Sequence, residues 1–231
     1  MSLSEFVKNK RVAVVGPASY LEGKNFGKLI DDYDVVVRPN YFHMLPHLKK
    51  DYGTRTDILF HNFGTEWMNG LKDNIRNNQK EFDEIKMMVC PVLYGTRGKE
   101  ENYMSWPEDH VGDVVHNAKS INENQVPFEW IGVKKYQEFY NAIGCQPYTG
   151  VLSVLMLLEC PLKELYLTGF DFYGTDKVYV DGFQNPLDGP PPNRGGSHGG
   201  DSSVRQKKYL RDVYSMSNHF EVDDRMRELF S

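Results

Sequence analysis

Long apolar runs are missing from this sequence of 231 residues: no stretch approaches the roughly 18 apolar residues that a membrane span requires. The amino-terminal residues 1–10 also lack the apolar core and the small-residue cleavage site of a secretory signal peptide. Cysteine is scarce, and Cys90, Cys145 and Cys160 follow no metal-site spacing. An odd number of cysteines without a secretion signal indicates reduced thiols, so we expect a cytoplasmic protein with no transmembrane segment.

Positive charge is in the minority, with 27 Lys and Arg residues against 32 Asp and Glu and a formal net charge of −5. Binding to a nucleic-acid backbone requires a basic face, and the short basic pairs at 49–50, 134–135 and 207–208 are typical of solvated helix faces. We therefore expect no nucleic-acid partner. Hydrophobic residues make up 40% of the chain and aromatic residues 13%, which is enough for a core of ordinary size.

Standard nucleotide-binding motifs are absent from the amino-terminal region, although it combines an apolar run, a glycine turn, a helical stretch and a second apolar run. A dinucleotide fingerprint needs several spaced glycines and an acid after the second strand. The turn at 16–19 has one glycine, and the second run ends in Arg38-Pro39-Asn40, which argues against NAD. A P-loop has about four residues between its glycine and Gly-Lys. Six separate Gly16 from Gly23 here, which argues against that motif.

Metal-ligating patterns are equally weak. Asp32-Tyr33-Asp34 has the letters of the Asp-x-Asp motif of metal-dependent sugar transferases. It precedes the second strand, opposite the edge where parallel sheets bind ligands, and we interpret it as an acidic turn. His43 and His47 are spaced as two ligands on a helix would be, yet Pro46 lies between them and no third ligand accompanies them. We expect no metal ion and no cofactor.

Apolar runs alternate with helical stretches along the chain, which is typical of an α/β fold with a mostly parallel central sheet flanked by helices. We predict a single Rossmann-like domain over residues 1–231. Predicted strands cover 11–16, 34–39, 57–62, 85–91 and 164–170, with a weaker one at 219–222; predicted helices cover 24–31, 65–75, 134–143, 150–159 and 202–216.

Two regions depart from this alternation. Residues 94–130 show little periodicity and are predicted to form loops and short helices around a site. Residues 181–200 are rich in glycine and proline, a composition that no packed element has. Two interpretations of this segment are open: a lid over the site, or a disordered surface insertion.

Three blocks of sequence follow one another in a recognisable order. The first contains Ala13-Val14-Val15-Gly16 and ends in Arg38-Pro39-Asn40, the second begins at Pro147-Tyr148-Thr149-Gly150, and the third has a histidine before a helix and a late strand. In order and spacing these blocks resemble the eukaryotic-type sialyltransferases. The segment Gly169-Phe170-Asp171-Phe172-Tyr173, with Tyr179 six residues further on, is similar to the bacterial lipooligosaccharide sialyltransferases.

The resemblance implies a GT-A-like variant of the Rossmann-type fold. It also implies a glycosyltransferase that moves sialic acid, or a related keto-acid sugar, from a CMP-sugar donor to a glycan hydroxyl with inversion and without a metal. The general base would be His198, because an imidazole with an unperturbed pKa of about 6.5 is neutral at physiological pH. The local sequence alone favours a solvent-exposed loop histidine at position 198, whereas the order of the three blocks favours the general base. Tyr173 and Tyr179 would donate hydrogen bonds to the departing phosphate; otherwise they are two ordinary aromatic residues.

The other substrate-binding residues implied by the resemblance lie at strand ends and at a helix start. Side chains at the carboxyl ends of parallel strands can reach a ligand in the crevice, and the free N–H groups of a helix start suit a carboxylate or phosphate. The full set predicted to bind substrate is Gly16, Pro17, Ser19, Asn40, Asn62, Thr149, Gly150, Gly169, Phe170, Asp171, Tyr173 and Tyr179.

Several positions depart from the relatives, and two of these departures bear on substrate recognition. Pro17 stands where they carry asparagine, and Gln146 or Pro147 stands where the bacterial enzymes carry arginine. These departures leave two alternatives beside the sialyltransferase hypothesis. One is a glycosyltransferase that uses a different nucleotide sugar, and the other is a non-catalytic nucleotide-binding module of the same fold.

Overall fold

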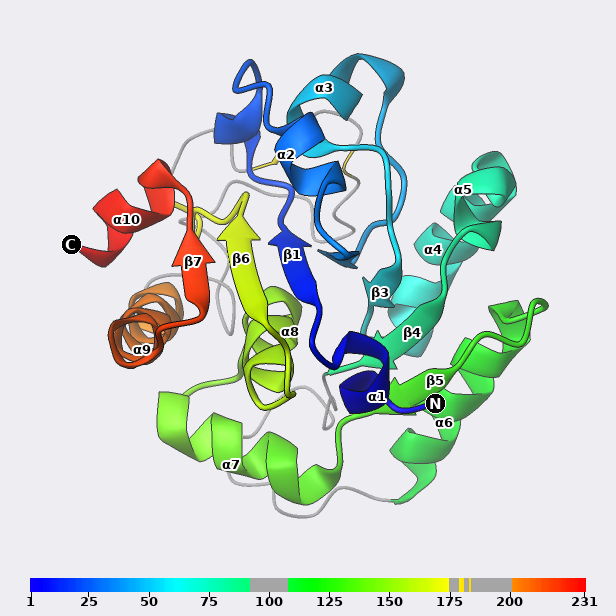
Figure 1. Cartoon of the computed structure of the whole chain (residues 1–231). Coiled ribbons are helices and arrows are strands. Elements are labelled where there is room, and N and C mark those ends of the chain that lie inside the picture. The colour runs from blue at the N-terminus through cyan, green and yellow to red at the C-terminus, as the bar shows by residue number, and fades with distance from the viewer. Residues whose placement is uncertain (92–107, 175–178, 181–182, 184–200) are drawn as a thin grey trace.

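The computed structural model describes residues 1–91, 108–174, 179–180, 183 and 201–231 (Figure 1). At its centre lies a seven-stranded sheet in the order β5-β4-β3-β2-β1-β6-β7. Every neighbouring pair in this sheet is parallel, which confirms the predicted α/β class. The strands are β1 Arg11–Val15, β2 Val35–Pro39, β3 Ile58–Phe60, β4 Met87–Cys90, β5 Phe128–Trp130, β6 Glu164–Thr168 and β7 Phe220–Val222.

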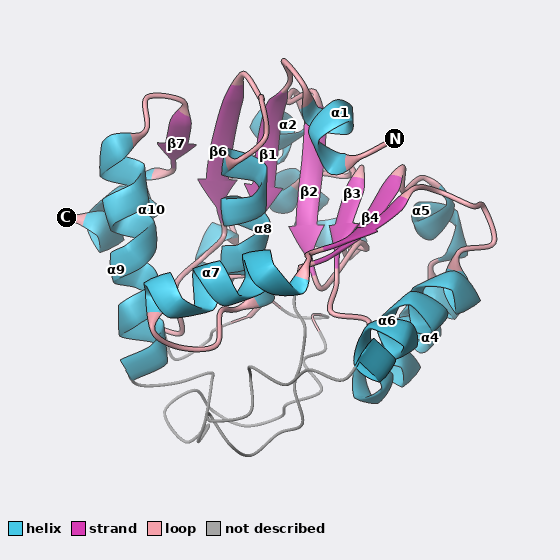
Figure 2. Ribbon diagram, turned by 90° about the horizontal axis from the view of Figure 1, so that it is seen from below, coloured by secondary structure: helices cyan, strands magenta, loops and turns pink. Residues whose placement is uncertain are grey.

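Helices cover both faces of the sheet, so the central strands are buried on both sides and consist mainly of apolar residues. Figure 2 shows α8 on one face and α2 on the other. The α-helices are α1 Leu3–Val7, α2 Gly27–Asp31, α3 Lys49–Tyr52, α4 Thr65–Asn77, α5 Gln79–Asp83, α6 Glu108–Ile121, α7 Val133–Ile143, α8 Thr149–Leu158, α9 Asp201–Met216 and α10 Asp224–Phe230, and the 3₁₀ turns are η1 Ser19–Leu21 and η2 Pro46–Leu48.

The alternation of side chains along each strand divides the core between the two faces. Val12 and Val14 of β1 belong to the larger cluster, which packs against α1, α7, α8, α9 and α10. Ala13 and Val15 point the other way and pack against η1, α2 and α3. Further along the sheet on that same face, Leu59 of β3 packs with apolar residues of α4, α5 and α6. Helix α8 is apolar on nearly every side because it lies between the sheet and α1.

Short sequence signals fix where several helices begin and end. Ser2 and Glu5 form a capping box at α1, in which each side chain accepts a hydrogen bond from the other residue's backbone N–H. Asp223 caps α10 by accepting a hydrogen bond from the backbone N–H of Met226. Helix α7 stops at Gly144, whose φ of 77° places it in the left-handed region that glycine adopts without strain.

The six predicted strands and the five predicted helices are confirmed, each within a few residues of the predicted ends. Strand β5 was not predicted, because its half-buried residues at the sheet edge give no apolar run. The expectation of loops and short helices over 94–130 is wrong from residue 108 onward, where α6 forms a helix of 14 residues. Its buried face, Val114, Ala118 and Ile121, has the spacing of a surface helix, but glycine and charged residues interrupt the pattern.

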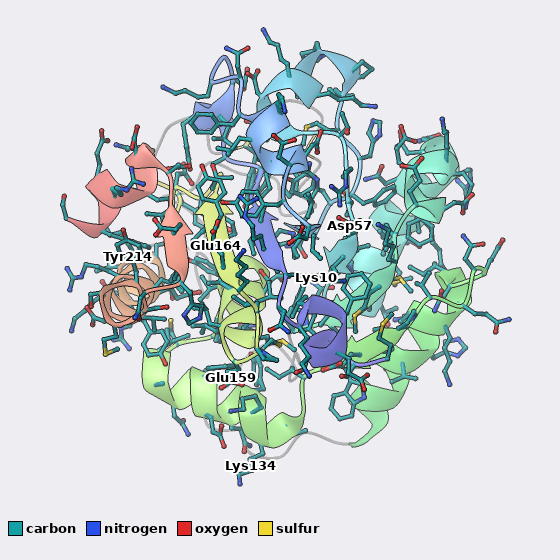
Figure 3. The ribbon with its side chains drawn as sticks, viewed as in Figure 1. Lys10, Asp57, Lys134, Glu159, Glu164 and Tyr214 are labelled. Atoms are coloured by element: carbon teal, nitrogen blue, oxygen red, sulfur yellow. The ribbon has the colours of Figure 1, made fainter. Side chains whose placement is uncertain are left out.

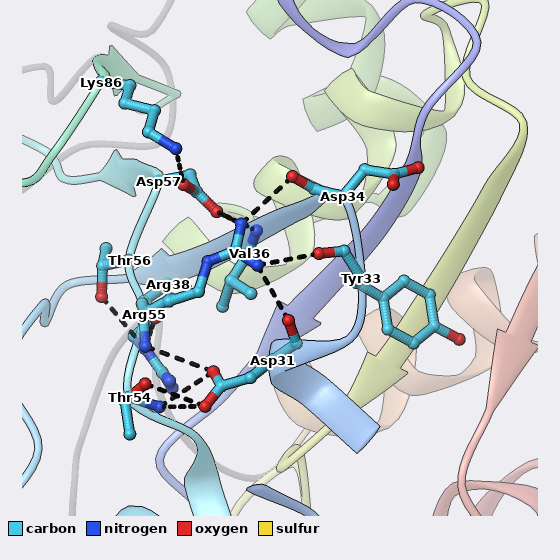
Figure 4. A network of polar contacts seen from close by, with 10 residues as sticks. All are labelled: Asp31, Tyr33, Asp34, Val36, Arg38, Thr54, Arg55, Thr56, Asp57 and Lys86. Atoms are coloured by element: carbon cyan, nitrogen blue, oxygen red, sulfur yellow. Dashed lines mark hydrogen bonds and ion pairs between the residues drawn. The ribbon is translucent and has the colours of Figure 1, made fainter. Parts of the chain in front are cut away.

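Charged side chains gather at the edge of the sheet where the strands begin. Asp57, which precedes β3 and is 3% exposed, accepts hydrogen bonds from the backbone N–H of Val36, from Arg55 at 2.7 Å and from Lys86 at 2.6 Å. Asp31 accepts hydrogen bonds from both the N–H and the hydroxyl of Thr54 (Figure 4). Figure 3 labels Asp57 and, on the same edge, Glu164 at the start of β6. These ion pairs and hydrogen bonds fix the loops at the amino-terminal edge of the sheet, away from the carboxyl ends of the strands.

The two acids of the Asp-x-Asp sequence are also structural. Asp34 accepts a hydrogen bond from the backbone N–H of Arg11, and Asp32 pairs with Lys28 on the surface of α2.

No helix in the described part of the chain is long and apolar enough to cross a membrane.

We expect Asp57→Ala to lower the free energy of unfolding by about 2–3 kcal/mol, because it leaves a buried N–H without an acceptor and removes the partner of two cations. Urea unfolding measures this change. The matched control is Asp32→Ala, which breaks the exposed Lys28–Asp32 pair and should cost less than about 0.5 kcal/mol. Equal losses in the two variants would contradict the structural role of Asp57.

Candidate active site

The candidate site lies at the carboxyl edge of the sheet, between β1 and β6. The chain passes from β1 outward to β5 and then returns to place β6 on the other side of β1. Such a switch in strand order opens a crevice at the strand ends, where open α/β sheets bind their ligands. The first residues beyond the two strands are Gly16 and Gly169, and both were predicted to bind substrate.

Gly16 and Gly169 touch each other across this crevice. A Cβ atom added at Gly16 would lie 2.2 Å from the carbonyl oxygen of Gly169, and one added at Gly169 would lie 2.2 Å from that of Gly16. Gly169 also has a φ of 76°, in the region that other residues adopt with strain. Both glycines are therefore required by the close approach of the two backbones.

The ring of Phe170 lies between this glycine contact and the start of α8. A Cβ at Gly16 would be 2.7 Å from the ring, and one at Gly150 would be 2.5 Å from it. Thr149 and Gly150 form the first turn of α8, where the side chain of the N-cap residue Tyr148 makes no capping hydrogen bond. The structure thus brings together Gly16 from the first predicted block of sequence with Gly150, Gly169 and Phe170 from the second.

Pro17 has a clear structural role. The residues on either side of it continue the ladder to β6, since the N–H of Gly16 donates to Thr168 at 2.8 Å and that of Ala18 donates to Gly169 at 3.0 Å. Proline's missing N–H removes no bond from this ladder. On the other side, the carbonyl of Pro17 accepts a hydrogen bond from the N–H of Val180 at 2.9 Å. The turn after β1 is thereby joined to the segment that carries Tyr179.

The predicted tyrosine pair comes together in space. The hydroxyl of Tyr179 donates to that of Tyr173 at 2.9 Å, and an isolated bridge between Tyr179 and Ala18 holds the segment against the turn after β1. Tyr173 has a φ of 63°, and its N–H donates to the carboxylate of Asp171 at 3.0 Å. The tight turn at Asp171 therefore directs Tyr173 back toward Tyr179.

Further aromatic rings extend this pair on both sides. Tyr148 packs edge-on against Tyr173 at 5.3 Å between ring centroids, and Phe183 packs against Tyr179 at 4.6 Å. Burial raises the pKa of Tyr148 to about 12, so its hydroxyl is protonated at physiological pH. Tyr148 was noted only as part of the second block of sequence, and neither Tyr148 nor Phe183 was predicted to bind substrate.

Helix α9 is attached to the start of α8 by polar contacts. The hydroxyl of Tyr148 and that of Ser203 are hydrogen-bonded at 2.8 Å. The buried side chain of Gln206 accepts from the N–H of Tyr148 at 2.7 Å and donates to the carbonyl of Gln146 at 3.2 Å. Gln146, one of the positions where relatives carry arginine, thus contributes its backbone to this attachment.

The two predicted asparagines also lie at the carboxyl edge. Asn40 follows β2, is exposed, and has a φ of 65° that turns the chain away from the sheet. Asn62 follows β3 and is buried; its side-chain oxygen accepts a hydrogen bond from the N–H of Gly64 at 2.9 Å. Ser19, also predicted to bind substrate, is half-buried and begins η1 in the turn after β1.

Arg38, in the sequence that ends β2, is 1% exposed and is used within the protein. Its guanidinium donates to the carbonyl of Tyr52 at 2.7 Å and to the hydroxyl of Tyr41 at 2.9 Å. Tyr41 in turn donates to the carbonyl of Val15 at 2.9 Å, next to Gly16. Through Tyr41, Arg38 therefore helps to fix the end of β1, directly before the turn at Gly16.

Several predictions fall on other parts of the chain. His198 lies outside the described residues, as does all of the 181–200 segment except Phe183. His43 lies 3.6 Å from a carboxylate oxygen of Glu81. Within the described ranges, no group of three His, Cys, Asp or Glu side chains is arranged to hold a metal ion.

Residues 4–93 match the model of glycosyltransferase family 29, the sialyltransferases. The fold is similar to that of a mammalian sialyltransferase in complex with Gal-beta-1-3GalNAc-ortho-nitrophenol, with a TM-score of 0.58 and 16% identity over 96% of this chain and 71% of that one. It is also similar to two variants of the sialyltransferase CST-II in complex with CMP, each with a TM-score of 0.52, at 18% and 19% identity over 94% of this chain and 88% and 87% of theirs. No curated protein sequence matches the chain.

The resemblance to the sialyltransferase family is confirmed. The family match includes the turn after β1 and the ends of β2 and β3, and the solved structures share the fold over nearly the whole chain. Together these findings support a glycosyltransferase. The sialyltransferase match ends before α8, β6 and the tyrosine pair, so those parts of the site rest on the shared fold and on the resemblance seen in the sequence.

Two buried groups at the carboxyl edge of the sheet were not predicted. His61, at the end of β3, is 4% exposed, and its Nδ1 accepts a hydrogen bond from the N–H of Phe63 at 3.0 Å. Burial lowers the pKa of His61 to about 4. Asp223, directly after β7, is 4% exposed and accepts a hydrogen bond from the hydroxyl of Tyr20. The contacts of Asp223 with Tyr20 and Thr168 join residues far apart in the sequence, so no local signal identifies them.

We expect Gly169→Ala to lower the free energy of unfolding by more than about 2 kcal/mol, because the new Cβ would meet the backbone of Gly16 and would require a strained φ. The control is Gly70→Ala, in α4, where nothing lies within 4 Å of the added Cβ. That change should stabilise the protein by about 0.5–1 kcal/mol through better helix propensity. Urea unfolding of both variants tests this, and an unaltered midpoint for Gly169→Ala would contradict the tight contact.

The buried His61 should make the protein less stable as the pH falls. The unfolded chain binds a proton below pH about 6.5 whereas the folded protein resists it until about pH 4, so this one residue should cost about 3 kcal/mol by pH 4. His61→Asn retains an acceptor for the N–H of Phe63 and should lose less stability than the wild type between pH 6.5 and pH 4. His116→Asn, at an exposed position of α6, is the matched control. Identical pH profiles for the two variants would contradict this prediction.

Proposed function

We propose that this chain is a sialyltransferase that moves sialic acid, or a related keto-acid sugar, from a CMP-sugar donor to a glycan hydroxyl. The observation that carries the proposal is the hydrogen-bonded pair of Tyr173 and Tyr179, held beside the turn after β1 at the crevice of a sialyltransferase fold. The family match of the amino-terminal part and the CMP complexes of two structures with this fold support it.

The CMP-sugar is proposed to bind across the crevice between β1 and β6. Glycine at positions 16 and 169 lets the two backbones meet beyond the strand ends, with the ring of Phe170 beside them, so this part of the proposed site consists of backbone groups and that ring. The first turn of α8 adds N–H groups and the positive end of a helix dipole, which favour a phosphate or the carboxylate of the sugar. Asn40, exposed at the end of β2, is available to the nucleotide on the other side.

The two tyrosines are proposed to stabilise the leaving group. When the bond between the sugar and the phosphate breaks, negative charge grows on the phosphate oxygens of CMP. Two phenol groups 2.9 Å apart can both donate to that phosphate, and preplaced donors of this kind are worth about 2–4 kcal/mol each in oxyanion holes. Because the tyrosines supply this stabilisation, the reaction as proposed requires no metal ion.

His198 is proposed as the general base on the strength of the resemblance. The oxygen of the acceptor hydroxyl attacks the anomeric carbon of the sugar, CMP departs from the opposite side with the bonding electrons, and His198 takes the acceptor proton, which inverts the anomeric centre. A positioned base contributes a factor of about 10²–10⁴ in rate. Helix α9 begins three residues after His198 and is attached to the start of α8 through Tyr148 and Ser203.

The purified protein should release CMP when it is incubated with CMP-sialic acid, and an acceptor glycan should accelerate the release. Tyr173→Phe and Tyr179→Phe should each lower the rate on the order of 30- to 1,000-fold, because each removes one phosphate donor. His198→Ala should lose transfer at least tenfold and still bind CMP, since a base acts on the acceptor and not on the nucleotide. A coupled assay for CMP and calorimetric titration with CMP measure the two effects.

Tyr214→Phe is the matched control for loss of a phenol hydroxyl. Tyr214 lies on α9 and packs against Phe220 and Phe230, near β7 and α10 (Figure 3). A similar loss in Tyr214→Phe and Tyr173→Phe would argue against a specific role of the pair. Binding of UDP or GDP in preference to CMP would favour another nucleotide sugar, and CMP binding without release from any donor would favour a non-catalytic module.

A further inference from the structure

Tyr20 and Asp223 connect the turn after β1 with the turn after β6. The N–H of Gly169 donates to the hydroxyl of Tyr20 at 2.7 Å, and that hydroxyl donates to the carboxylate of Asp223 at 2.7 Å. The same carboxylate oxygen accepts from the hydroxyl of Thr168 at 2.5 Å, and the other accepts from the N–H of Met226 at 2.7 Å. One carboxylate thus holds the last residue of β6, the turn after β1 and the first turn of α10.

The direction of these hydrogen bonds follows from which groups can donate and which can only accept. Asp223 is 4% exposed, and its carboxylate accepts three hydrogen bonds. Burial, with the Asp223 charge as the second cause, raises the pKa of Tyr20 far above its usual value, so the phenol is protonated and donates to the carboxylate. Its oxygen is then left to accept the N–H of Gly169. A phenylalanine at position 20 would break both hydrogen bonds.

This arrangement acts on the part of the backbone that carries the candidate nucleotide site. Gly169 turns in the left-handed region and contacts Gly16, and the next two residues are Phe170 and Asp171. Tyr20 lies four residues after Gly16, so its side chain crosses from one wall of the crevice to the other. If the hydroxyl were removed, the N–H of Gly169 would lose its acceptor and the peptide between Thr168 and Gly169 would lose a fixed orientation.

We propose that Tyr20 and Asp223 are positioning residues: through the N–H of Gly169 and the hydroxyl of Thr168 they hold the two turns of the nucleotide site at their working distance. This inference rests on the proposed function, because it concerns the affinity of that site for the nucleotide part of a CMP-sugar. Neither residue is proposed to touch the reacting atoms. Their effect is on the binding of the nucleotide and only secondarily on the chemical step.

A comparable phenol–carboxylate hydrogen bond lies at the other end of β6 and serves as a control. Tyr33 is 5% exposed, and its hydroxyl donates to the carboxylate of Glu164 at 2.7 Å. Glu164 is the first residue of β6, at the amino-terminal edge, whereas Tyr20 acts just beyond the last residue of that strand. Tyr33→Phe therefore removes a phenol–carboxylate hydrogen bond of the same length without disturbing the carboxyl edge.

The test compares Tyr20→Phe, Asp223→Asn and Tyr33→Phe in the full chain. Calorimetric titration gives the Kd for CMP, steady-state kinetics with CMP-sialic acid gives KM and kcat, and hydrogen exchange followed by mass spectrometry reports on the peptide that contains 168–171. We expect Tyr20→Phe to raise the Kd for CMP and the KM for the donor about tenfold with a much smaller change in kcat, and to speed exchange in that peptide.

Asp223→Asn keeps the shape of the side chain and replaces one acceptor with a donor, so it should change the same quantities in the same direction. Tyr33→Phe should lower the urea midpoint and leave the Kd for CMP, the KM and the exchange of 168–171 at wild-type values. Equal Kd and exchange in Tyr20→Phe and Tyr33→Phe would overturn the inference and leave the proposed function intact. A wild-type protein that binds no CMP would overturn the proposed function, and the exchange data alone would then decide whether Tyr20 orders the turn.

Discussion

The contact between Gly16 and Gly169 is the constraint on which the rest of the candidate site depends. At a switch in strand order the connections that leave the two neighbouring strands usually separate and open a crevice, but here the backbones meet directly beyond the last paired residues. This contact places Phe170 against Gly150 at the start of α8. The next residue, Asp171, begins the tight turn that carries Tyr173. A side chain at either glycine would separate the turns and, with them, the residues on each side of the crevice.

The two edges of the sheet use different chemistry. At the amino-terminal edge, Asp57 is paired with two cations and a backbone N–H, and Asp31 accepts hydrogen bonds from backbone N–H groups and the hydroxyl of Thr54. At the carboxyl edge, Tyr173 and Tyr179 contribute neutral hydroxyls, which are donors that a phosphate can use without first displacing a buried ion pair. The carboxyl edge thus offers hydroxyl groups to a ligand in addition to the buried contacts that stabilise it.

The fold could be predicted from the sequence because β1, β2, β3, β4 and β6 are apolar runs bounded by polar residues, and because their alternation with helices indicates a parallel sheet. The half-buried edge strand β5 has no such run, and α6 begins in a stretch whose glycine and charges hide its apolar face. Within the site, glycines and the tyrosine pair were accessible through their resemblance to known blocks. Tyr20 and Asp223 were not, because a contact between residues 203 positions apart leaves no local pattern.

The long separation of these partners explains why a match over 4–93 cannot by itself establish a working site. The matched part supplies one wall, the turn after β1, whose hydrogen bonds run to Thr168, Gly169 and Val180 in a different part of the chain. Asp223 comes from the end of the chain and holds both walls through Tyr20 and Thr168. The site is therefore formed only when β6 and β7 have joined the sheet, so changes that loosen β7 should weaken nucleotide binding even though β7 does not border the crevice.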